Sequence, residues 1–486
     1  MKIAGLDIGT TGCKLTVFGE DGAELGKAYR DYPVRRMVGA QEMDISVMME
    51  SVYAVIREMA DKVPDIGGIG VTSFGEVFVM TDEAGEPLHN AMLYTDPRGD
   101  KECAELTEKL GASNIAEITG LAPHAMYSIS KMMWIKRHWP EVYAAARRIH
   151  LIEDFVVWHL TGTAQIDYSL ATRTMAFDIR KLDWSREIFD AAGIDVSLMS
   201  RTVPTGTSAG TVTPDAAGRT GLDSGCIIVS AAHDQVAAAV GAGVFDGRTA
   251  VDGAGTVECL EPVYDSLPDI RIMSRGKYAV VPCAVPGKYV AYAFSYTGGA
   301  LIQWCMETFG KGETNQSMEV AYGKDEPTGL LVLPHFAGAA TPYMDSGSKG
   351  ALIGLTLATT PAEIYRACME GVVYEMRLNY ENLAGSGIHF NKLNATGGGA
   401  RSRVWMQMKA DVLDLPVTAL KTVDAGTVGS AMLAGIRTGL FTDLEDAAKT
   451  MVQEVETYYP RPEMHEKYME IYERYRKLYE AVRPLV

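Results

Sequence analysis

The sequence predicts an α/β protein built from two domains. Its 486 residues are more than one compact core usually holds, and its 47% hydrophobic and 22% charged residues are typical of a globular protein. Short apolar runs alternate with glycine turns and with helical patterns along the chain. A strand–turn pattern from the first residues also returns about half the chain later, which favours two related domains.

The N-terminal residues predict a β-hairpin, a further strand, a helix and a buried strand, in that order. Apolar runs at 3–6 and 14–18 flank a glycine turn, and Asp-Gly at 21–22 then leads into a strand near 24–29. Between 45 and 59 apolar residues recur at spacings of three and four, which predicts an amphipathic helix. The apolar run 69–72 follows as a buried strand.

The opening pattern reappears near residue 249. Residues 5–10 read Gly-Leu-Asp-Ile-Gly-Thr, and residues 251–256 read Val-Asp-Gly-Ala-Gly-Thr. In both places an apolar strand is broken by a turn that combines Asp, Gly and Thr. Two such turns at the spacing of a domain indicate duplicated domains that face one another across a cleft.

The last residues predict an amphipathic helix. An apolar stripe recurs at helical spacing, with charged side chains opposite, and consists of Tyr468, Ile471, Tyr472, Tyr475, Leu478, Tyr479 and Val482. We expect this stripe to pack across the protein surface. A dimer face is the alternative.

Charge and cysteine content exclude several classes of protein. The net charge of −17, without a long basic run, argues against nucleic acid or an anionic membrane surface as the main partner. The seven cysteines are scattered without a C-x-x-C pair, so neither a disulfide framework nor a zinc site is expected. We find no signal-peptide pattern and no stretch of about 18 uncharged apolar residues, and therefore expect a cytoplasmic protein without a membrane span.

Three glycine-rich turns are suited to binding phosphate, at residues 9–12, 253–256 and 396–400. Unhindered backbone N–H groups in such turns can donate to phosphate oxygens. The third turn precedes a helix that should start near Ser402, where an anion or the ribose-phosphate edge of a nucleotide is favoured. For each turn alone, an ordinary chain reversal is the alternative. Because neither a Walker-type G-x-x-x-x-G-K-[ST] nor an N-terminal G-x-G-x-x-G occurs, P-loop and Rossmann folds lose their main support.

Two aspartates stand where phosphoryl transfer would need carboxylates. That reaction requires a metal held by carboxylate and a base for the hydroxyl proton. Asp7 ends the first strand, where it could hold magnesium or cap the turn. Asp234 follows the apolar run 229–232 and starts a small-residue helix, where it could be an N-cap or a general base. These residues alone leave both alternatives open, and the adjacent His233 is expected to be a packed, hydrogen-bonded histidine.

Several ordered motifs resemble those of the FGGY carbohydrate kinases, within the actin/hexokinase/heat-shock ATPase superfamily. Residues 5–14 look like the family's Asp-x-Gly-Thr phosphate motif with a following basic residue, and 126–136 is similar to its first signature. Residues 350–355 and 363–370 look like its second signature, in which Cys368 is a mild departure. The resemblance covers nearly the whole chain. It implies two ribonuclease-H-like (actin-like ATPase) domains flanking a catalytic cleft.

The same resemblance implies an activity, which is ATP-dependent and magnesium-dependent phosphorylation of a small sugar or polyol, most simply a ketose such as a pentulose. By this resemblance Asp234 matches the catalytic base and Asp7 the acid near Mg²⁺. The implied ATP contacts are Thr10, Thr11, Lys14, Gly255, Thr256, Gly398 and Gly399. The implied substrate contacts are Gly75, Glu76, Asp96, Arg98, Asp234 and Gln235. We expect the sugar on domain 1–245, the nucleotide on domain 246–440, and a helical extension over 441–486.

Two positions depart from the family pattern and keep alternatives open. Glu76 stands where Gln is usual, and an ionised Glu accepts hydrogen bonds without donating them. This change motivates a kinase for a modified sugar or a polyol signal as an alternative. The loop 338–342 lacks the Glu-Arg pair of many relatives, which supports a non-catalytic nucleotide-binding sensor as a second alternative. A homodimer is common among relatives and is kept beside a monomer.

Overall fold

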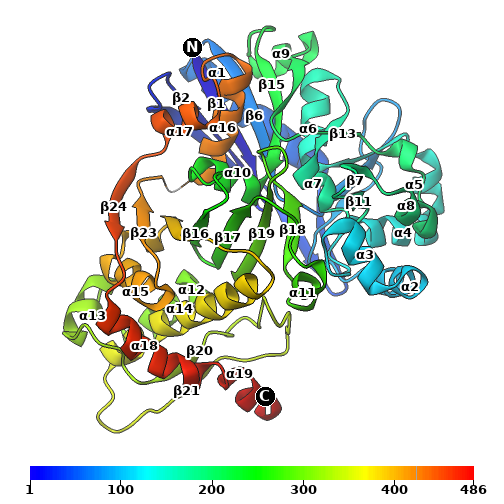
Figure 1. Ribbon diagram of the computed structural model, residues 1–486. Coiled ribbons are helices and arrows are strands. Elements are labelled where there is room, and N and C mark those ends of the chain that lie inside the picture. The colour runs from blue at the N-terminus through cyan, green and yellow to red at the C-terminus, as the bar shows by residue number, and fades with distance from the viewer. Residues whose placement is uncertain (423) are drawn as a thin grey trace. The chain divides into compact units, whose positions relative to one another are not determined.

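The computed structural model describes residues 1–422 and 424–486, and it divides into two compact units (Figure 1). The first unit contains Met1–Phe245, Val280–Val290 and Asp424–Val452. The second contains Asp246–Ala279, Ala291–Val423 and Gln453–Val486. The boundaries in the middle of the chain fall inside β18 (Ala279–Pro282) and β19 (Tyr289–Ser295). Neither unit is therefore one continuous stretch of sequence.

The first unit is built on a sheet with the strand order β14-β15-β6-β1-β2-β3. Its strands are β1 (Lys2–Ile8), β2 (Gly12–Phe18), β3 (Glu24–Asp31), β6 (Ile66–Ser73), β14 (Thr207–Thr211) and β15 (Ile227–His233). β1 runs antiparallel to β2 and parallel to β6, and β6 runs parallel to β15. The predicted hairpin and buried strand are confirmed.

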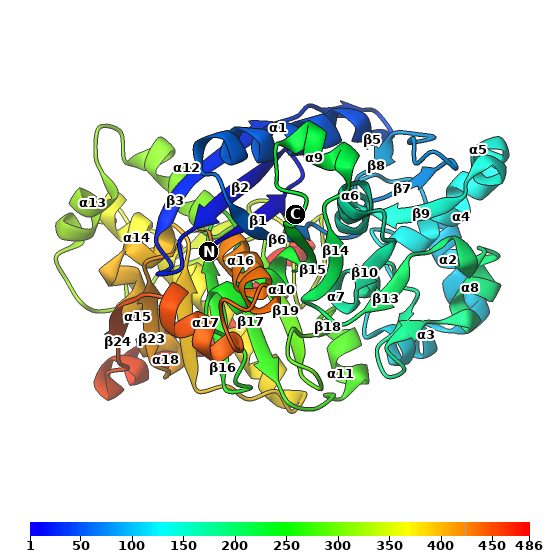
Figure 2. The same ribbon diagram turned by 90° about the horizontal axis from the view of Figure 1, so that it is seen from above.

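Helices cover both faces of this sheet, as Figure 2 shows for α1 and α16. α1 (Ile45–Lys62) buries its apolar stripe on one face and is capped by Asp44, which accepts from the backbone N–H groups of Ser46 and Val47. The predicted amphipathic helix is thus confirmed. α16 (Ala425–Arg437) packs on the other face so closely that a Cβ at Gly5 would overlap the carbonyl oxygen of Thr427. The fold therefore needs glycine at that strand position.

The remaining elements of the first unit surround this core. Its other helices are α2 (Asp100–Leu110), α3 (Ala112–Thr119), α4 (Ser128–His138), α5 (Pro140–Ala145), α6 (Ile152–Thr161), α7 (Tyr168–Thr172), α8 (Arg186–Ala192), α9 (Pro214–Thr220), α10 (Asp234–Gly241) and α17 (Leu444–Met451). Its shorter strands are β4 (Val34–Met37), β5 (Ala40–Met43), β7 (Phe78–Thr81), β8 (Ala91–Met92), β9 (Arg148–Leu151), β10 (Gln165–Asp167), β11 (Phe177–Asp178), β12 (Asp183–Trp184) and β13 (Arg201–Val203).

The second unit repeats the plan of the first. In its main sheet, neighbouring strands follow one another as β19, β17 (Glu258–Tyr264), β16 (Thr249–Ala254), β22 (Lys392–Thr396), β23 (Val417–Leu420) and β24 (Glu454–Tyr458). β16 is antiparallel to β17 and parallel to β22. β1 has the same two relationships to β2 and β6, so the internal repeat predicted from the sequence is confirmed.

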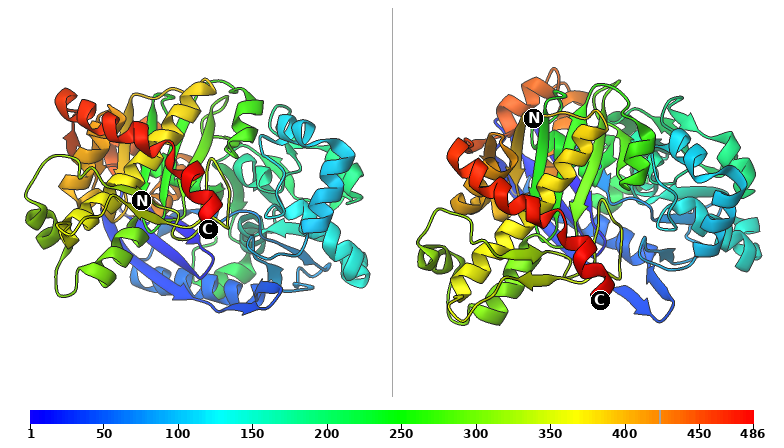
Figure 3. Two further views of the ribbon diagram at one scale, coloured as in Figure 1. Left: turned by 90° about the horizontal axis from the view of Figure 1, so that it is seen from below. Right: turned by 60° about the horizontal axis from the view of Figure 1, so that its bottom comes forward.

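The helices of the second unit include the long α14, which runs beside the C-terminal segment (Figure 3). They are α11 (Ile270–Arg275), α12 (Gly299–Phe309), α13 (Asn315–Tyr322), α14 (Pro361–Gly385), α15 (Arg403–Leu413), α18 (Pro462–Tyr475) and α19 (Leu478–Val482), with short strands β20 (Leu331–Leu333) and β21 (Ala351–Ile353). The predicted packing of the C-terminal stripe is confirmed, since Tyr472 and Tyr475 are buried and donate to Glu381 and Glu375 of α14. The segment is two helices rather than one. None of the helices in the described part of the chain combines the length and apolar composition that a bilayer crossing needs.

Candidate active site

The carboxyl ends of three parallel strands bring distant parts of the first unit together. β1 pairs Ile8 with Ser73 of β6, and β6 in turn pairs Ser73 with His233 of β15. Because parallel strands end at one edge of a sheet, the segments that follow them are neighbours there. Asp7, Glu76 and Asp234 lie at or just beyond these ends. The structure thus gathers three of the predicted site residues at one sheet edge.

Asp234 is the first residue of α10, and the N-cap position belongs to His233. Asp234 is therefore not the N-cap residue, which removes that alternative. Its Oδ1 accepts from the backbone N–H of Gln235 at 2.7 Å and lies 3.1 Å from His233 Nε2. Burial deprives the side chain of hydration, although 33% of it remains exposed, and together with the charges of Asp7 and Glu76 it raises the pKa of Asp234 to about 7.

His233 is a neutral neighbour of this carboxylate. The imidazole is buried, and burial lowers its pKa well below the usual value. Its backbone N–H donates to Ser169 Oγ at 2.8 Å, and that hydroxyl donates to the buried Asp167 at 2.7 Å. The prediction of a packed histidine is confirmed, and its hydrogen bond to Ser169 is made by the backbone. Sequence reasoning missed Ser169 and Asp167, which fix the turn that carries Asp234 and lie more than 60 residues before it.

Asp7 shares a lysine with a carboxylate from the far end of the chain. Lys14 Nζ lies 3.5 Å from Asp7 Oδ2 and 3.0 Å from Asp424 Oδ1. Burial raises the pKa of Asp7, and the attraction of Lys14 opposes that rise. For Lys14, burial would lower the pKa, but Asp7 and Asp424 together raise it. Asp424 follows Lys14 by 410 residues, and no local pattern marked it.

These carboxylates fit a hydrated magnesium ion better than a fully protein-bound one. Asp7, Asp234 and Asp424 keep 26%, 33% and 39% of their side chains exposed, and Mg²⁺ prefers carboxylate oxygen together with retained water. Within residues 1–422 and 424–486, no group of three or more His, Cys, Asp or Glu is arranged as a direct coordination shell. An ion held here would thus keep most of its water ligands.

The second copy of the repeat is closed to such an ion. Asp252 occupies the place in β16 that Asp7 has in β1, but its carboxylate is fully buried and bonded to Lys409 at 2.7 and 2.8 Å. Lys409 is also buried and bonds Glu258 at 2.5 Å. The Lys409 ammonium group thus bonds both carboxylates, Asp252 and Glu258. The two copies therefore differ in chemistry although they share a fold.

Glu76 is held in an unusual conformation by an ion pair. Its φ is 67°, in the left-handed region that disfavours side chains with a Cβ. Arg173 Nε donates to Glu76 Oε1 at 2.7 Å, and Ser128 Oγ donates to the Glu76 carbonyl oxygen at 2.7 Å. Gly75 leaves the space for this pair, because a Cβ there would lie 2.6 Å from Arg173 Cγ. Arg173 is a further residue that the sequence did not reveal.

Asp96 and Arg98 bond mainly to each other and to neighbouring strands. The buried Asp96 carboxylate accepts from the backbone N–H of Gln41 at 2.6 Å and from Arg98 Nε at 2.9 Å. Arg98 also bonds Glu42 at 2.8 Å and lies over the ring of Trp134 at 5.2 Å. The structure thus places both predicted substrate residues in a network that fixes the loop after β8 against β5.

The turn between β1 and β2 carries the predicted phosphate contacts of the first unit. Gly9 N–H donates to the Gly12 carbonyl oxygen at 2.9 Å, which closes the turn. Thr10 is half-buried and Thr11 is exposed. The turn therefore holds two threonines at its tip, where their hydroxyl and N–H groups are the donors suited to phosphate oxygens.

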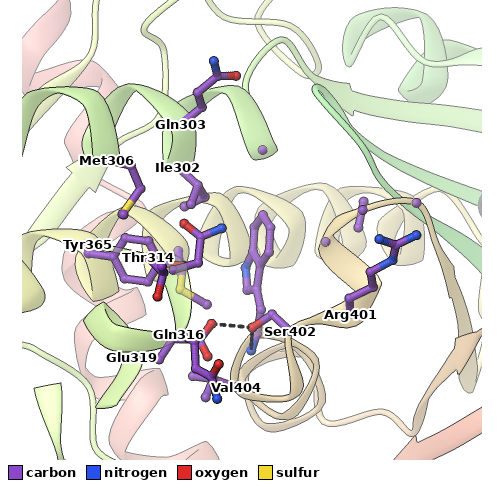
Figure 4. A pocket seen from close by; sticks show the side chains of 18 of the residues that line it. Ile302, Gln303, Met306, Thr314, Gln316, Glu319, Tyr365, Arg401, Ser402 and Val404 are labelled. Atoms are coloured by element: carbon purple, nitrogen blue, oxygen red, sulfur yellow. Dashed lines mark hydrogen bonds between the residues drawn. The ribbon is translucent and has the colours of Figure 1, made fainter. Parts of the chain in front are cut away.

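The second unit contains a pocket of about 1300 Å³, shown in Figure 4. Two glycine turns line it, and they contribute all four residues predicted to contact the nucleotide in this half of the chain, which are Gly255, Thr256, Gly398 and Gly399. The turns pack directly on each other. Gly397 has a φ of 91°, and a Cβ there would lie 2.6 Å from the Ala254 carbonyl oxygen. The structure thus brings the second and third predicted glycine turns into one pocket.

Polar side chains close one side of this pocket. Ser402 accepts from the backbone N–H of Trp405 and so caps α15, as predicted for the helix after the third turn. Its hydroxyl donates to Glu319 at 2.7 Å (Figure 4). Gln303 and Arg401 also line the space. The pocket therefore offers glycine backbone on one part of its wall and hydrogen-bonding side chains on another.

The loop 338–342 is held within the second unit. Thr341 Oγ1 accepts from Phe294 N–H at 2.8 Å and donates to the Phe294 carbonyl oxygen at 3.1 Å. Gly338 adopts a φ of 93°. The loop is thus held by hydrogen bonds between the Thr341 hydroxyl and the backbone of Phe294.

Comparisons with known proteins agree over the whole chain. The model of the FGGY family of carbohydrate kinases, N-terminal domain, matches residues 2–241, and that of its C-terminal domain matches residues 257–438. The chain is 26% identical to the xylulose kinase of Bacillus subtilis over 481 residues, which is 96% of this chain and 94% of the relative. It is 30% identical to the glycerol kinase of Symbiobacterium thermophilum over 469 residues, which is 92% of this chain and 91% of the relative.

Solved structures show the same fold. The xylulose kinase from Rhodospirillum rubrum matches with a TM-score of 0.90 at 26% identity, covering all of this chain and 99% of that one. The gluconate kinase from Lactobacillus acidophilus matches with a TM-score of 0.91 at 24% identity, covering 99% and 98%. The predicted pair of actin-like ATPase domains is confirmed. The chain belongs to the FGGY family of carbohydrate kinases, which are phosphotransferases that use ATP and take an alcohol group as acceptor.

Proposed function

We propose that this kinase transfers the terminal phosphate of ATP to a hydroxyl of a small sugar or polyol, with Asp234 as the general base. The observation that carries the proposal is the raised pKa of Asp234, about 7, at a sheet edge shared with Asp7 and Glu76. A base is most effective when its pKa lies near the working pH. The relatives named xylulose kinase and glycerol kinase support the class of acceptor, and a ketose such as a pentulose is the leading candidate.

In the proposed reaction Asp234 accepts the proton of the acceptor hydroxyl while its oxygen attacks the terminal phosphorus. The bond between that phosphorus and the bridging oxygen of ADP breaks as the new bond forms. The hydrogen bond from Gln235 N–H and the 3.1 Å contact with His233 Nε2 both involve Oδ1 of Asp234. We therefore assign proton acceptance to Oδ2. The neutral His233 and the Gln235 N–H orient the carboxylate without protonating it.

The roles that we propose for the other predicted residues follow from where each lies in its unit. Glu76, Gly75 and Gln235 would contact the acceptor directly, while Asp96 and Arg98 would shape its site through the loop that they fix. Thr10, Thr11 and Lys14 would donate to phosphate oxygens. Gly255, Thr256, Gly398 and Gly399 would bind the nucleotide in the pocket of the second unit. Magnesium, when bound, would neutralise phosphate charge, and Asp7 would hold it through water.

The test is coupled ADP release with ATP and magnesium, measured against pentuloses, hexuloses, deoxysugars, aldonates and polyols. We expect one strong acceptor-dependent signal, and we expect Asp234→Asn to abolish it while ATP binding stays nearly intact. A variant that keeps more than about a tenth of the normal rate would remove Asp234 from the role of base, since removing a general base costs about 10²–10⁴-fold. If no acceptor on the panel causes ADP release although ATP binds, the alternative of a non-catalytic nucleotide-binding sensor is favoured. The altered loop 338–342 is the observation that suggests this alternative.

A further inference from the structure

The acceptor side of the candidate site contains a buried ion pair whose charges cancel. Arg173 and Glu76 are 7% and 6% exposed, and two guanidinium nitrogens of Arg173 bond to Glu76 Oε1. The guanidinium also lies over the ring of Tyr127, at 5.2 Å from its centre. The bond from Ser128 holds the backbone of Glu76. The pair is therefore fixed in position and differs from the mobile ion pairs of a protein surface.

This pair adjoins the proposed base. A Cβ at Gly75 would lie 2.6 Å from Arg173 Cγ and 3.1 Å from His233 Cδ2, so both side chains meet at this glycine. His233 in turn lies 3.1 Å from Asp234. Glu76 and Arg173 are both close enough to Asp234 to change its pKa, in opposite directions. An acceptor bound at Asp234 would thus be near both members of the pair.

We infer that the Glu76–Arg173 pair makes the acceptor site select neutral polyols and ketoses against anionic acceptors such as aldonates. The inference rests on the proposed function, in which the acceptor hydroxyl binds at Asp234. A carboxylate on the acceptor would meet the negative charge of Asp234, and Arg173, the adjacent guanidinium, is already neutralised by Glu76. A hydroxyl in the same place meets no such repulsion and can hydrogen bond to acceptor and donor groups alike.

Removal of the Glu76 charge should reverse this preference. In Glu76→Gln the guanidinium of Arg173 keeps its charge and loses its anionic partner. Arginine binds carboxylate with charge-assisted and often bidentate hydrogen bonds, so the acceptor's own carboxylate becomes a suitable partner. We expect the affinity for an aldonate to rise about tenfold or more. In the double variant Glu76→Gln/Arg173→Met both charges are absent, and this gain should disappear.

The experiment compares xylitol with xylonate, which differ only in one terminal group. Binding is measured by calorimetry for the wild-type enzyme, the two variants, and Glu102→Gln as a matched control. Glu102 is another buried carboxylate of the first unit, and its partner is Arg137. The expected result is tighter xylitol binding by the wild type, a gain for xylonate in Glu76→Gln alone, and no gain in the control. Equal gains in Glu76→Gln and in the double variant would overturn the inference.

The wild-type enzyme provides a test that needs no variant. If it binds xylonate as tightly as xylitol, the inference is wrong whether or not Glu76→Gln folds. Binding is read without turnover, so the two proposals can fail separately. Wild-type enzyme that binds xylitol selectively but releases no ADP with any acceptor of the panel would support the selectivity and contradict the proposed function. Folding of each variant is checked by its thermal unfolding.

Discussion

Asp234 lies in surroundings that disfavour its own charge, because burial and the neighbouring Asp7 and Glu76 all raise its pKa. The same surroundings make it a stronger base when it is ionised. Glu76 shows a related cost, since its left-handed backbone at φ 67° is disfavoured by about 1–3 kcal/mol. Strained and charge-crowded residues cluster at functional sites. Both residues thus point to chemistry rather than to stability.

The first prediction concerns the pH dependence of the reaction. A base must be deprotonated to accept a proton, so kcat/KM should fall as the pH is lowered through about 7, the pKa of Asp234. kcat/KM is the appropriate quantity because it reports groups of the free enzyme. It is measured for the best acceptor of the panel from about pH 5.5 to 9 at saturating magnesium. A profile that stays flat below pH 7 would contradict the role of Asp234.

The second prediction concerns stability. The pKa of Asp234 is raised on folding. Its favourable contribution to the free energy of unfolding is therefore complete below the pKa of the unfolded state, 3.8, and is lost as the pH rises through about 7. Above pH 7 the ionised side chain opposes folding. Asp234→Asn should therefore increase the free energy of unfolding at pH 8 by on the order of 1 kcal/mol, after allowance for the partial exposure of the side chain, and so raise the thermal midpoint. The gain should shrink toward pH 5. A variant that is less stable than wild type at pH 8 would refute this account.

At the scale of secondary-structure elements, strand ends and glycine turns determine the site. Parallel pairing places the ends of β1, β6 and β15 at one edge, and the contact between Gly397 and Ala254 joins two turns into one pocket wall. Two neighbouring glycines of the same turn, Gly397 and Gly398, differ in the space that a Cβ would have. A Cβ at Gly397 would meet backbone, whereas a Cβ at Gly398 meets nothing within 4 Å.

The third prediction uses this contrast. Gly397→Ala should destabilise the protein by about 1–3 kcal/mol, because it combines a positive φ with a backbone clash. Gly398→Ala should leave stability nearly unchanged, because the added methyl group meets no atom within 4 Å, and should weaken ATP binding, because Gly398 lines the pocket that we assign to the nucleotide. Thermal unfolding with and without ATP separates the two effects. Unchanged ATP affinity in Gly398→Ala would place the nucleotide elsewhere.

Local sequence patterns predicted the elements better than they predicted the contacts between them. The hairpin, α1 and the repeated strand–turn pattern all follow from the spacing of apolar residues and glycines. Arg173 and Asp424 could not be predicted in this way, because they meet Glu76 and Lys14 across 97 and 410 residues. Such pairs exist only once the sheet is formed. The helix cap at His233, in place of Asp234, likewise depends on the exact end of β15.

At the scale of the whole molecule, the first unit depends on a late part of the chain. α16 covers the face of its sheet opposite α1, and the residues buried there include Val428, Ala431 and Met432. These residues pack with Ile3 and Val229 of the sheet. Residues 1–245 therefore lack part of their own core when they are separated from the remainder.

The fourth prediction follows. A fragment of residues 1–245 should aggregate or unfold without a cooperative transition, because one face of its sheet is uncovered. Joining residues 424–452 to this fragment through a flexible linker should restore solubility and cooperative unfolding. Circular dichroism and analytical ultracentrifugation of both proteins provide the measurement. Cooperative folding of residues 1–245 alone would show that α16 and α17 are dispensable for this core.

The place of α16 in the chain also affects how the protein is made. The ribosome releases the sheet of the first unit about 180 residues before it reaches codon 424, an interval of roughly 10–40 s at about 5–20 residues per second. Through that time the nascent sheet has an apolar face without its helix, which is the kind of surface that chaperones bind. A nonsense mutation late in the gene therefore disrupts the first unit, most of which is translated first. Any premature stop before codon 424 removes α16 from the core that was translated first.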